Sequence, residues 1–79
     1  MLRTKKWSIY TRDGQYLGRY SAFAPETALS QYFAVNGREI SETQIKYDHV
    51  DDQVHTLRHN SEVFVVASDD GLSSARKMH

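Results

Sequence analysis

The dipeptide Asp13-Gly14 stands between two short runs in which apolar and polar residues alternate, residues 7–11 and 16–20. An Asp-Gly pair in this setting is a strong signal for a β-hairpin, because a type I′ turn needs a positive φ at both central residues. The turn predicts three cross-strand pairs: Trp7 with Tyr20, Ile9 with Gly18, and Thr11 with Tyr16. The first quarter of the chain is therefore expected to be an antiparallel hairpin.

This register also predicts which hairpin residues point inward, since side chains alternate between the two faces of a strand. The more apolar set is expected on the core face: Trp7, Ile9, Thr11, Tyr16 and Tyr20. The opposite face is expected to carry a more polar set: Lys6, Ser8, Tyr10, Leu17, Arg19 and Ser21.

A helix is predicted next, from Pro25 to the pair Asn36-Gly37. Proline suits the first helical position, and glycine suits the left-handed position just past a helix end. Apolar residues recur at helical period and form one stripe: Ala28, Leu29, Tyr32 and Phe33. We expect this stripe to pack on the core face of the hairpin.

The segment after the helix leaves two interpretations open. Residues 43–47 fit a short strand, whereas Ser41 and Gln44 have the spacing of a capping box, which predicts a single helical turn. Residues 48–53 are polar and acidic, and they are expected to form a loop.

The last third predicts a second hairpin, with strands at residues 54–58 and 63–67 and a turn near residues 59–61. Residues 63–67 are apolar at consecutive positions rather than at alternate ones. That pattern is typical of a strand that is covered on both faces or lies in the centre of its sheet.

These elements predict a single small α+β domain over residues 5–68, preceded by an extension, residues 1–4, and followed by a flexible tail, residues 69–79. One helix is expected on one face of a four- or five-stranded sheet. The order hairpin, helix, short strand, hairpin resembles the ubiquitin-like β-grasp, although the chain ends in Arg76-Lys77-Met78-His79 and not in a diglycine. A plain antiparallel sheet with the helix across it fits the same order.

Composition favours a soluble, cytoplasmic protein. No run approaches the roughly 20 apolar residues of a membrane span, no signal peptide is evident, and cysteine is absent. The formal net charge is zero, but residues 1–20 carry +4 and residues 21–62 carry −4. This polarity either steers a charged partner or reflects the ordinary solvation of a small domain.

Metal binding and catalysis are not expected. The potential metal ligands cluster in one stretch: His49, Asp51, Asp52, His55 and His59. In a strand, His55 and His59 would lie about 13 Å apart and would not converge on one ion. The chain contains no nucleophile elbow, no glycine-rich phosphate loop and no HExxH motif. We therefore expect no enzyme activity, no cofactor and no small-molecule substrate.

A protein partner, or self-association, is the first functional hypothesis. It uses the outer hairpin face, where apolar side chains are rimmed by arginines: Tyr10, Leu17, Arg12 and Arg19. Tyrosine and arginine are enriched at interface hot spots, and open sheet edges accept strands from other chains.

Nucleic-acid binding is the alternative hypothesis, because basic and aromatic residues alternate along the first hairpin. The expected contacts are Lys5, Lys6, Tyr10, Arg12 and Arg19. This hypothesis ranks second because the predicted register turns Tyr16 and Tyr20 inward and leaves one ring outside.

Overall fold

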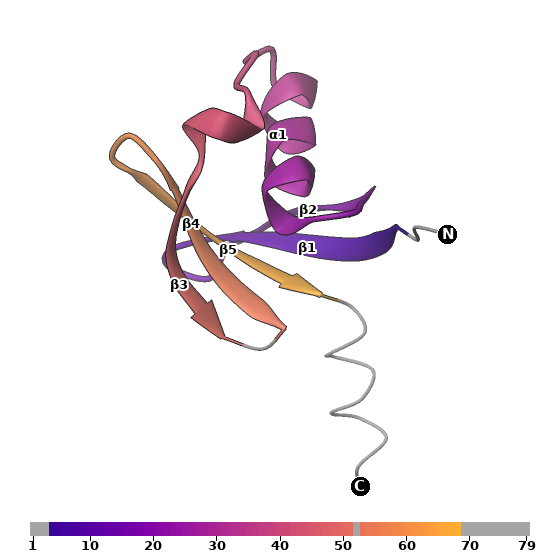
Figure 1. The fold of residues 1–79 in the computed structure, drawn as a ribbon, viewed down its shortest axis with the longest axis vertical. Helices are drawn as coiled ribbons and strands as arrows, with labels where there is room; N and C mark the ends of the chain where they lie inside the picture. The colour runs from indigo at the N-terminus through magenta and orange to yellow at the C-terminus, as the bar shows by residue number, and fades with distance from the viewer. Residues whose placement is uncertain (1–3, 52, 69–79) are drawn as a thin grey trace, which may run out of the picture.

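The computed structural model describes residues 4–51 and 53–68 (Figure 1). In chain order the elements are β1 (Lys5–Thr11), β2 (Tyr16–Ala22), α1 (Pro25–Val35), the 3₁₀ turn η1 (Glu42–Gln44), β3 (Lys46–Asp51), β4 (Val54–His59) and β5 (Glu62–Ser68). The helix α1 packs against one face of a five-stranded sheet, which confirms the predicted α+β class. The predicted tail and all but one residue of the predicted extension lie outside the described residues.

The strand order is β2-β1-β5-β4-β3, and every pair of neighbouring strands is antiparallel. Of the architectures that the element order left open, the plain antiparallel sheet is the one that forms. The likeness to the β-grasp is thus limited to the order of elements along the chain. β5 lies in the centre of the sheet, which is one of the two positions that its consecutive apolar residues predicted, and α1 covers one of its faces.

The first hairpin turns differently from the prediction. The Gly14 N–H donates to the Thr11 carbonyl (2.9 Å), and the Thr11 N–H donates to the Gln15 carbonyl (2.8 Å). Of the loop residues, Gly14 alone has a positive φ, 96°. The loop therefore has three residues, a type I turn followed by a left-handed glycine, and not the two-residue type I′ turn that was predicted.

The register consequently shifts near the turn. Tyr16 lies opposite Tyr10 and not opposite Thr11, so the predicted Thr11–Tyr16 pair is wrong. Between this pair and the next, Ile9 with Gly18, the register slips by one residue, which leaves Leu17 as the extra residue of a β-bulge. Beyond the bulge the predicted pairs Ile9–Gly18 and Trp7–Tyr20 are confirmed.

The bulge exchanges two side chains between the faces of the sheet. Leu17 packs against the core cluster, although the alternation predicted it on the outer face. Tyr16 was predicted to point inward, yet it shares a face with Tyr10 and is 56% exposed. Both predictions are wrong for the same reason, since one inserted residue reverses the alternation locally.

The helix agrees with its prediction. Pro25 occupies the first turn, Asn36 caps the C-terminal end, and Gly37 follows with a φ of 79°. The predicted stripe faces the sheet: Ala28, Leu29 and Phe33 are buried, and Tyr32 is partly buried. Together with residues of the sheet they form the core: Trp7, Ile9, Ala22, Ala28, Leu29, Phe33, Ile45, Leu57, Phe64 and Val66.

The segment after the helix forms both of the structures that its sequence allowed, one after the other. The Ser41 hydroxyl accepts from the Thr43 N–H, and the Ser41 N–H donates to the Gln44 side chain, so the capping box forms at η1. The strand begins later, at Lys46, and continues to Asp51. The predicted loop over residues 48–53 is therefore wrong for residues 48–51. These polar residues pair with β4 as an edge strand, where most side chains face water.

The second hairpin is confirmed. His59 pairs with Glu62 across a two-residue loop, in which Asn60 has a φ of 56°. No helix among the described residues is long and apolar enough to cross a membrane.

Candidate interaction surface

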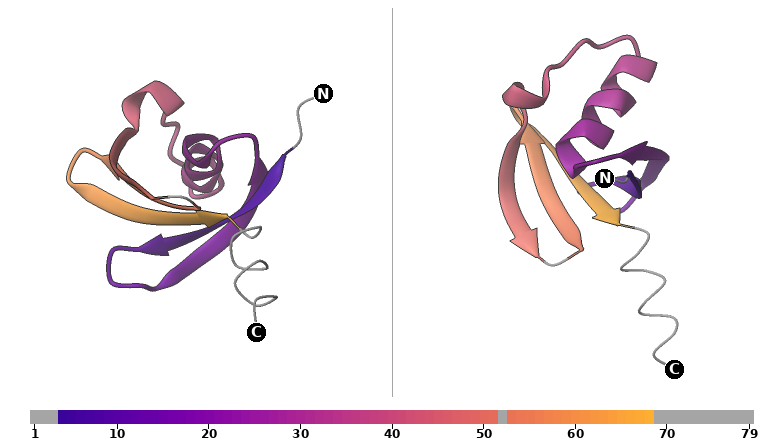
Figure 2. Two further views of the ribbon diagram at one scale, coloured as in Figure 1. Left: turned by 60° about the horizontal axis from the view of Figure 1, so that its bottom comes forward. Right: turned by 45° about the vertical axis from the view of Figure 1, so that its right-hand side comes forward.

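We call the sheet face opposite α1 the outer face; no described element covers it (Figure 2). The alternation along each strand and the ladder pairings place these residues on it: Lys6, Ser8 and Tyr10 of β1; Tyr16, Arg19 and Ser21 of β2; Val63, Val65 and Ala67 of β5; Val54, Thr56 and Arg58 of β4; and Lys46 and His49 of β3. The outer face thus spans all five strands.

A row of direct cross-strand partners crosses the middle of the outer face. It runs Tyr16, Tyr10, Val65, Thr56 and His49, one residue from each strand. Direct partners on one face lie about 5 Å apart, so these side chains form a continuous band. The band is apolar or aromatic over β2, β1 and β5, which makes the centre of the outer face an unusual surface to leave in water.

Tyr10 and Tyr16 form the aromatic end of this band. Their ring centroids are 5.6 Å apart and the rings are tilted by 57°. Tyr10 is half-buried, whereas Tyr16 exposes more than half of its surface. Tyr16 is therefore the ring that a partner can reach most fully, and Tyr10 supports it from the neighbouring strand.

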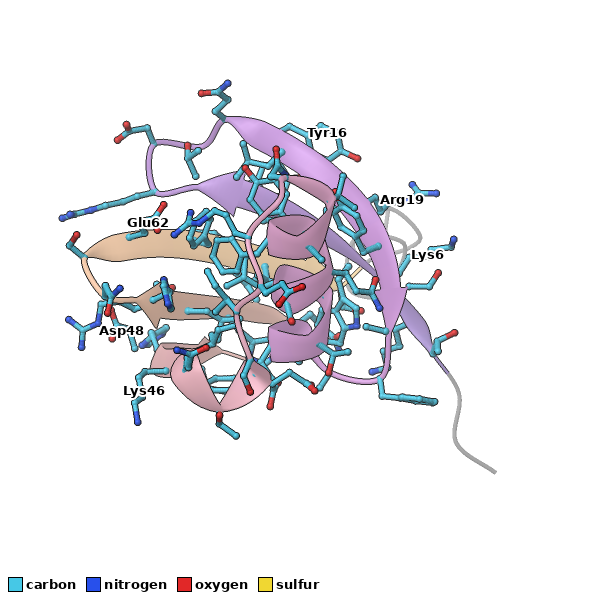
Figure 3. All side chains as sticks on the ribbon, turned by 90° about the horizontal axis from the view of Figure 1, so that it is seen from above. Lys6, Tyr16, Arg19, Lys46, Asp48 and Glu62 are labelled. Atoms are coloured by element: carbon cyan, nitrogen blue, oxygen red, sulfur yellow. The ribbon has the colours of Figure 1, made fainter. Side chains whose placement is uncertain are left out.

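Two cations lie on the same face beyond the tyrosines. Lys6 pairs with Ser21, and Arg19 pairs with Ser8. The two cations are therefore diagonal neighbours on β1 and β2, and Figure 3 shows their side chains close together at the margin of the sheet. This end of the outer face is positively charged.

The far end of the outer face carries two more cations, Lys46 and its direct partner Arg58. Arg58 forms an ion pair with Asp48, with 3.2 Å between the nitrogen and the oxygen. The side chains described for this face thus include four cations (Lys6, Arg19, Lys46 and Arg58) and one carboxylate, a net charge of three positive.

The side of α1 has the opposite charge. Its carboxylates are held by neighbours around the helix: Glu26 accepts from the Tyr47 hydroxyl, Glu42 accepts from the Thr27 hydroxyl, and Glu62 pairs with Arg38. Burial and the hydrogen bond to Glu26 together raise the pKa of Tyr47. Glu39 lies beside the helix, on the wall of a shallow depression next to Ala34. The two faces thus differ in charge, although they do not match the two charged segments of the sequence: Lys46 and Arg58 of the outer face come from the acidic segment, residues 21–62, and Lys5 of the basic segment lies on the side of α1.

The ion pair between Arg38 and Glu62 gives the stability of the domain a component that depends on pH. Hydrogen bonds of 2.6 and 3.0 Å from Arg38 lower the pKa of Glu62 below its ordinary value of 4.5. Because the folded pKa lies below the unfolded one, this contribution is present above the unfolded pKa and is lost as the pH falls through the folded pKa.

We expect Glu62→Gln to lower the free energy of unfolding by about 0.5 kcal/mol at neutral pH, since both side chains of the pair are more than two-fifths exposed. In acid below the folded pKa the same substitution should have almost no effect. Urea unfolding at the two pH values measures the difference, and an equal loss at both would contradict the ion pair.

The residues predicted from the sequence to contact a partner do not all lie on one surface. Lys6, Tyr10 and Arg19 lie together on the outer face, and Arg12 is exposed in the adjoining turn. Lys5 belongs to the side of α1, because its Nζ lies 6.0 Å from the Trp7 ring centroid. Leu17 is turned toward the core, as described above.

The sequence missed Tyr16 as a surface residue. The sequence signal for the bulge is Gly18 opposite Ile9, which predicts either a bulge or a closely approaching helix, but it does not say that the extra residue is Leu17. Gly14 can close either a two-residue or a three-residue loop, and the length of the loop decides on which face of the sheet Tyr16 lies. Both faces were therefore compatible with the sequence.

The histidines do not converge. His55 lies between Trp7 and Tyr47, with centroid distances of 5.9 Å to each, on the side of α1. His59 is buried against Phe33 (5.6 Å) on that side, whereas His49 lies on the outer face. Among the described residues no group of three or more metal-binding side chains comes together.

No protein-family model and no curated protein matches the chain, and no solved structure matches it at a meaningful level of similarity.

Proposed function

We propose that this chain is a small non-enzymatic interaction module that acts in the cytoplasm and binds another macromolecule across its outer face. One observation carries the proposal. The central strand β5 is apolar on both faces, but α1 covers only one of them. Val63 and Val65 stay partly exposed on the other face, and the aromatic pair extends the apolar band over β1 and β2. A surface with an apolar centre and a rim of arginine and lysine is typical of binding sites.

Self-association and binding to a different protein both fall within this proposal. In either case the partner would cover the band from Tyr16 to Val65 and would remove apolar surface from water. A substitution that places a charge in this surface should weaken binding, because an unpaired carboxylate buried at an interface is strongly unfavourable.

Two exposed valines in neighbouring strands provide a matched test. Val54 is 41% exposed and lies on the outer face, whereas Val50 is 60% exposed and pairs with His55 on the other face. We expect Val54→Glu to weaken binding about tenfold or more and Val50→Glu to change it little. Both variants should remain folded, because both sites already contact water.

The measurement has two parts. Sedimentation velocity over a range of concentrations reports self-association of the two variants and the parent protein. Capture of binding partners on the immobilised full chain, from nuclease-treated and untreated extract of cells that make the protein, reports other partners. Equal behaviour of both variants in both assays would rule out the outer face as the binding surface.

A further inference from the structure

Resting on the proposed function, we propose that the partner of the outer face is a single-stranded nucleic acid, whose bases stack on the Tyr10–Tyr16 pair and whose phosphates contact Lys6 and Arg19. The four residues come from the neighbouring strands β1 and β2 and share one face of the sheet. Sheet domains that bind single strands use this combination of rings and cations.

Tyr16 gives the outer face a second and more exposed aromatic ring. With Tyr16 turned inward, the outer face would offer one half-buried ring. The bulge at Leu17 instead places Tyr16 beside Tyr10, with their centroids 5.6 Å apart. The 57° tilt means that the two rings present differently oriented surfaces. Such surfaces suit the bases of a flexible single strand, which turn independently, better than the fixed stack of a duplex.

The distribution of charge over the two faces also favours a polyanion on the outer face. The described side chains of the outer face have a net charge of three positive, and the carboxylates around α1 keep the opposite side negative. A polyanion is therefore attracted to the outer face and repelled from the helix side. The formal net charge of zero hides this arrangement, because it adds up the charges of the whole chain without regard to the face on which they lie.

The same charges argue against a second copy of the chain as the occupant. Two outer faces packed against each other would bring two positive surfaces together, with Lys6 and Arg19 in each. Like charges placed across an interface disfavour association. An acidic protein would also satisfy the cations, and tyrosine occurs at protein interfaces too, so an acidic protein is the competing occupant that the experiment has to separate from a nucleic acid.

Fluorescence anisotropy with the full chain tests the proposal. The probes are labelled mixed-sequence DNA and RNA single strands of about 12 nucleotides, within the length that one small domain occupies, and a duplex of the same sequence. We expect the single strands to bind at low salt and to dissociate as salt is added, and the duplex to bind more weakly. The DNA and RNA arms show which sugar is preferred.

Two substitutions assign the contacts. Tyr16→Ala should weaken binding about tenfold, the scale of losing one stacking ring, while Tyr16→Phe should retain it. Lys6→Gln should weaken binding and reduce the slope of log K against log salt by about 0.7, the value for one phosphate contact on a single strand. Lys5→Gln removes a cation one position along β1 but on the other face, so it should leave the slope unchanged.

Several outcomes would overturn the proposal: no binding of either single strand at low salt, equal affinity for the duplex, or equal losses for Lys5→Gln and Lys6→Gln. Polyglutamate competing as well as the oligonucleotide would also overturn it, in favour of an acidic protein. If the oligonucleotides fail but Val54→Glu still abolishes capture of another partner, the inference fails and the proposed function stands. If neither assay responds to the outer face, both fail.

Discussion

Phe33→Ala is expected to remove most of the free energy of unfolding of the domain. Phe33 is fully buried between α1 and the sheet, and its ring lies 5.3 Å from that of Phe64 and 5.6 Å from that of His59. Truncating a buried phenylalanine costs about 3–5 kcal/mol. A domain of this size has a total stability of about 5 kcal/mol, so the variant should keep about 0–2 kcal/mol and should unfold at a much lower temperature and urea concentration.

Circular dichroism during urea and thermal unfolding measures this loss. The control is Val35→Ala, two residues further along the same helix, where the side chain is 72% exposed. It should change the free energy of unfolding by no more than about 0.5 kcal/mol. Phe33→Leu keeps most of the buried volume and should fall between the two. Equal midpoints for Phe33→Ala and the parent protein would show that α1 does not pack on the sheet as described.

The parts of the fold that the sequence predicted are those governed by local signals. Pro25 and Gly37 mark the ends of α1, and the stripe around Phe33 fixes the face that it buries. Consecutive apolar residues in β5 predicted a strand that is covered on both faces or central in its sheet, and β5 is central. Residues 48–51 of β3 were predicted as a loop because an edge strand in water needs no apolar pattern.

In the first hairpin, the strand pairs far from the turn were predicted correctly although the predicted turn was wrong. The three-residue loop that ends at Gly14 shifts the pairing by one residue, and the bulge at Leu17 shifts it back. Trp7 and Ile9 therefore point inward as predicted, as their apolar side chains require. Only the side chains between the three-residue loop and the bulge lie on the face opposite to the predicted one, and Tyr16 is one of them.

The candidate site was consequently only half predictable. Lys6, Tyr10 and Arg19 follow from regular alternation along β1 and β2. Tyr16 depends on the three-residue loop and on where the extra residue of the bulge is inserted, and Gly18 signals a bulge without fixing its place. That place decides whether the outer face has one ring or two, and hence how the two functional hypotheses compare.

Gly18→Ala is expected to lower the free energy of unfolding by about 3 kcal/mol. Gly18 has a φ of 146°, a conformation that residues with a side chain rarely adopt, and such backbone strain costs about 1–3 kcal/mol. A Cβ atom at this position would also lie 3.1 Å from the ring of Tyr20, which packs against the core cluster. Displacing that ring adds an overpacking penalty of about 1–3 kcal/mol. Thermal and urea unfolding measure the sum.

Gly14→Ala separates the two contributions. Gly14 also has a positive φ, 96°, but no atom lies within 4 Å of the position that a Cβ would occupy. It should therefore show only the backbone strain, about 1 kcal/mol, and remain folded.

The additional free energy of unfolding that Gly18→Ala loses, compared with Gly14→Ala, measures how tightly the Tyr20 ring packs over β2. Because the added methyl group displaces the Tyr20 ring, Gly18→Ala should also change the tyrosine near-ultraviolet dichroism, whereas Gly14→Ala should not. Equal losses for the two glycines, with an unchanged tyrosine signal, would mean that the Tyr20 ring does not pack over Gly18 as described.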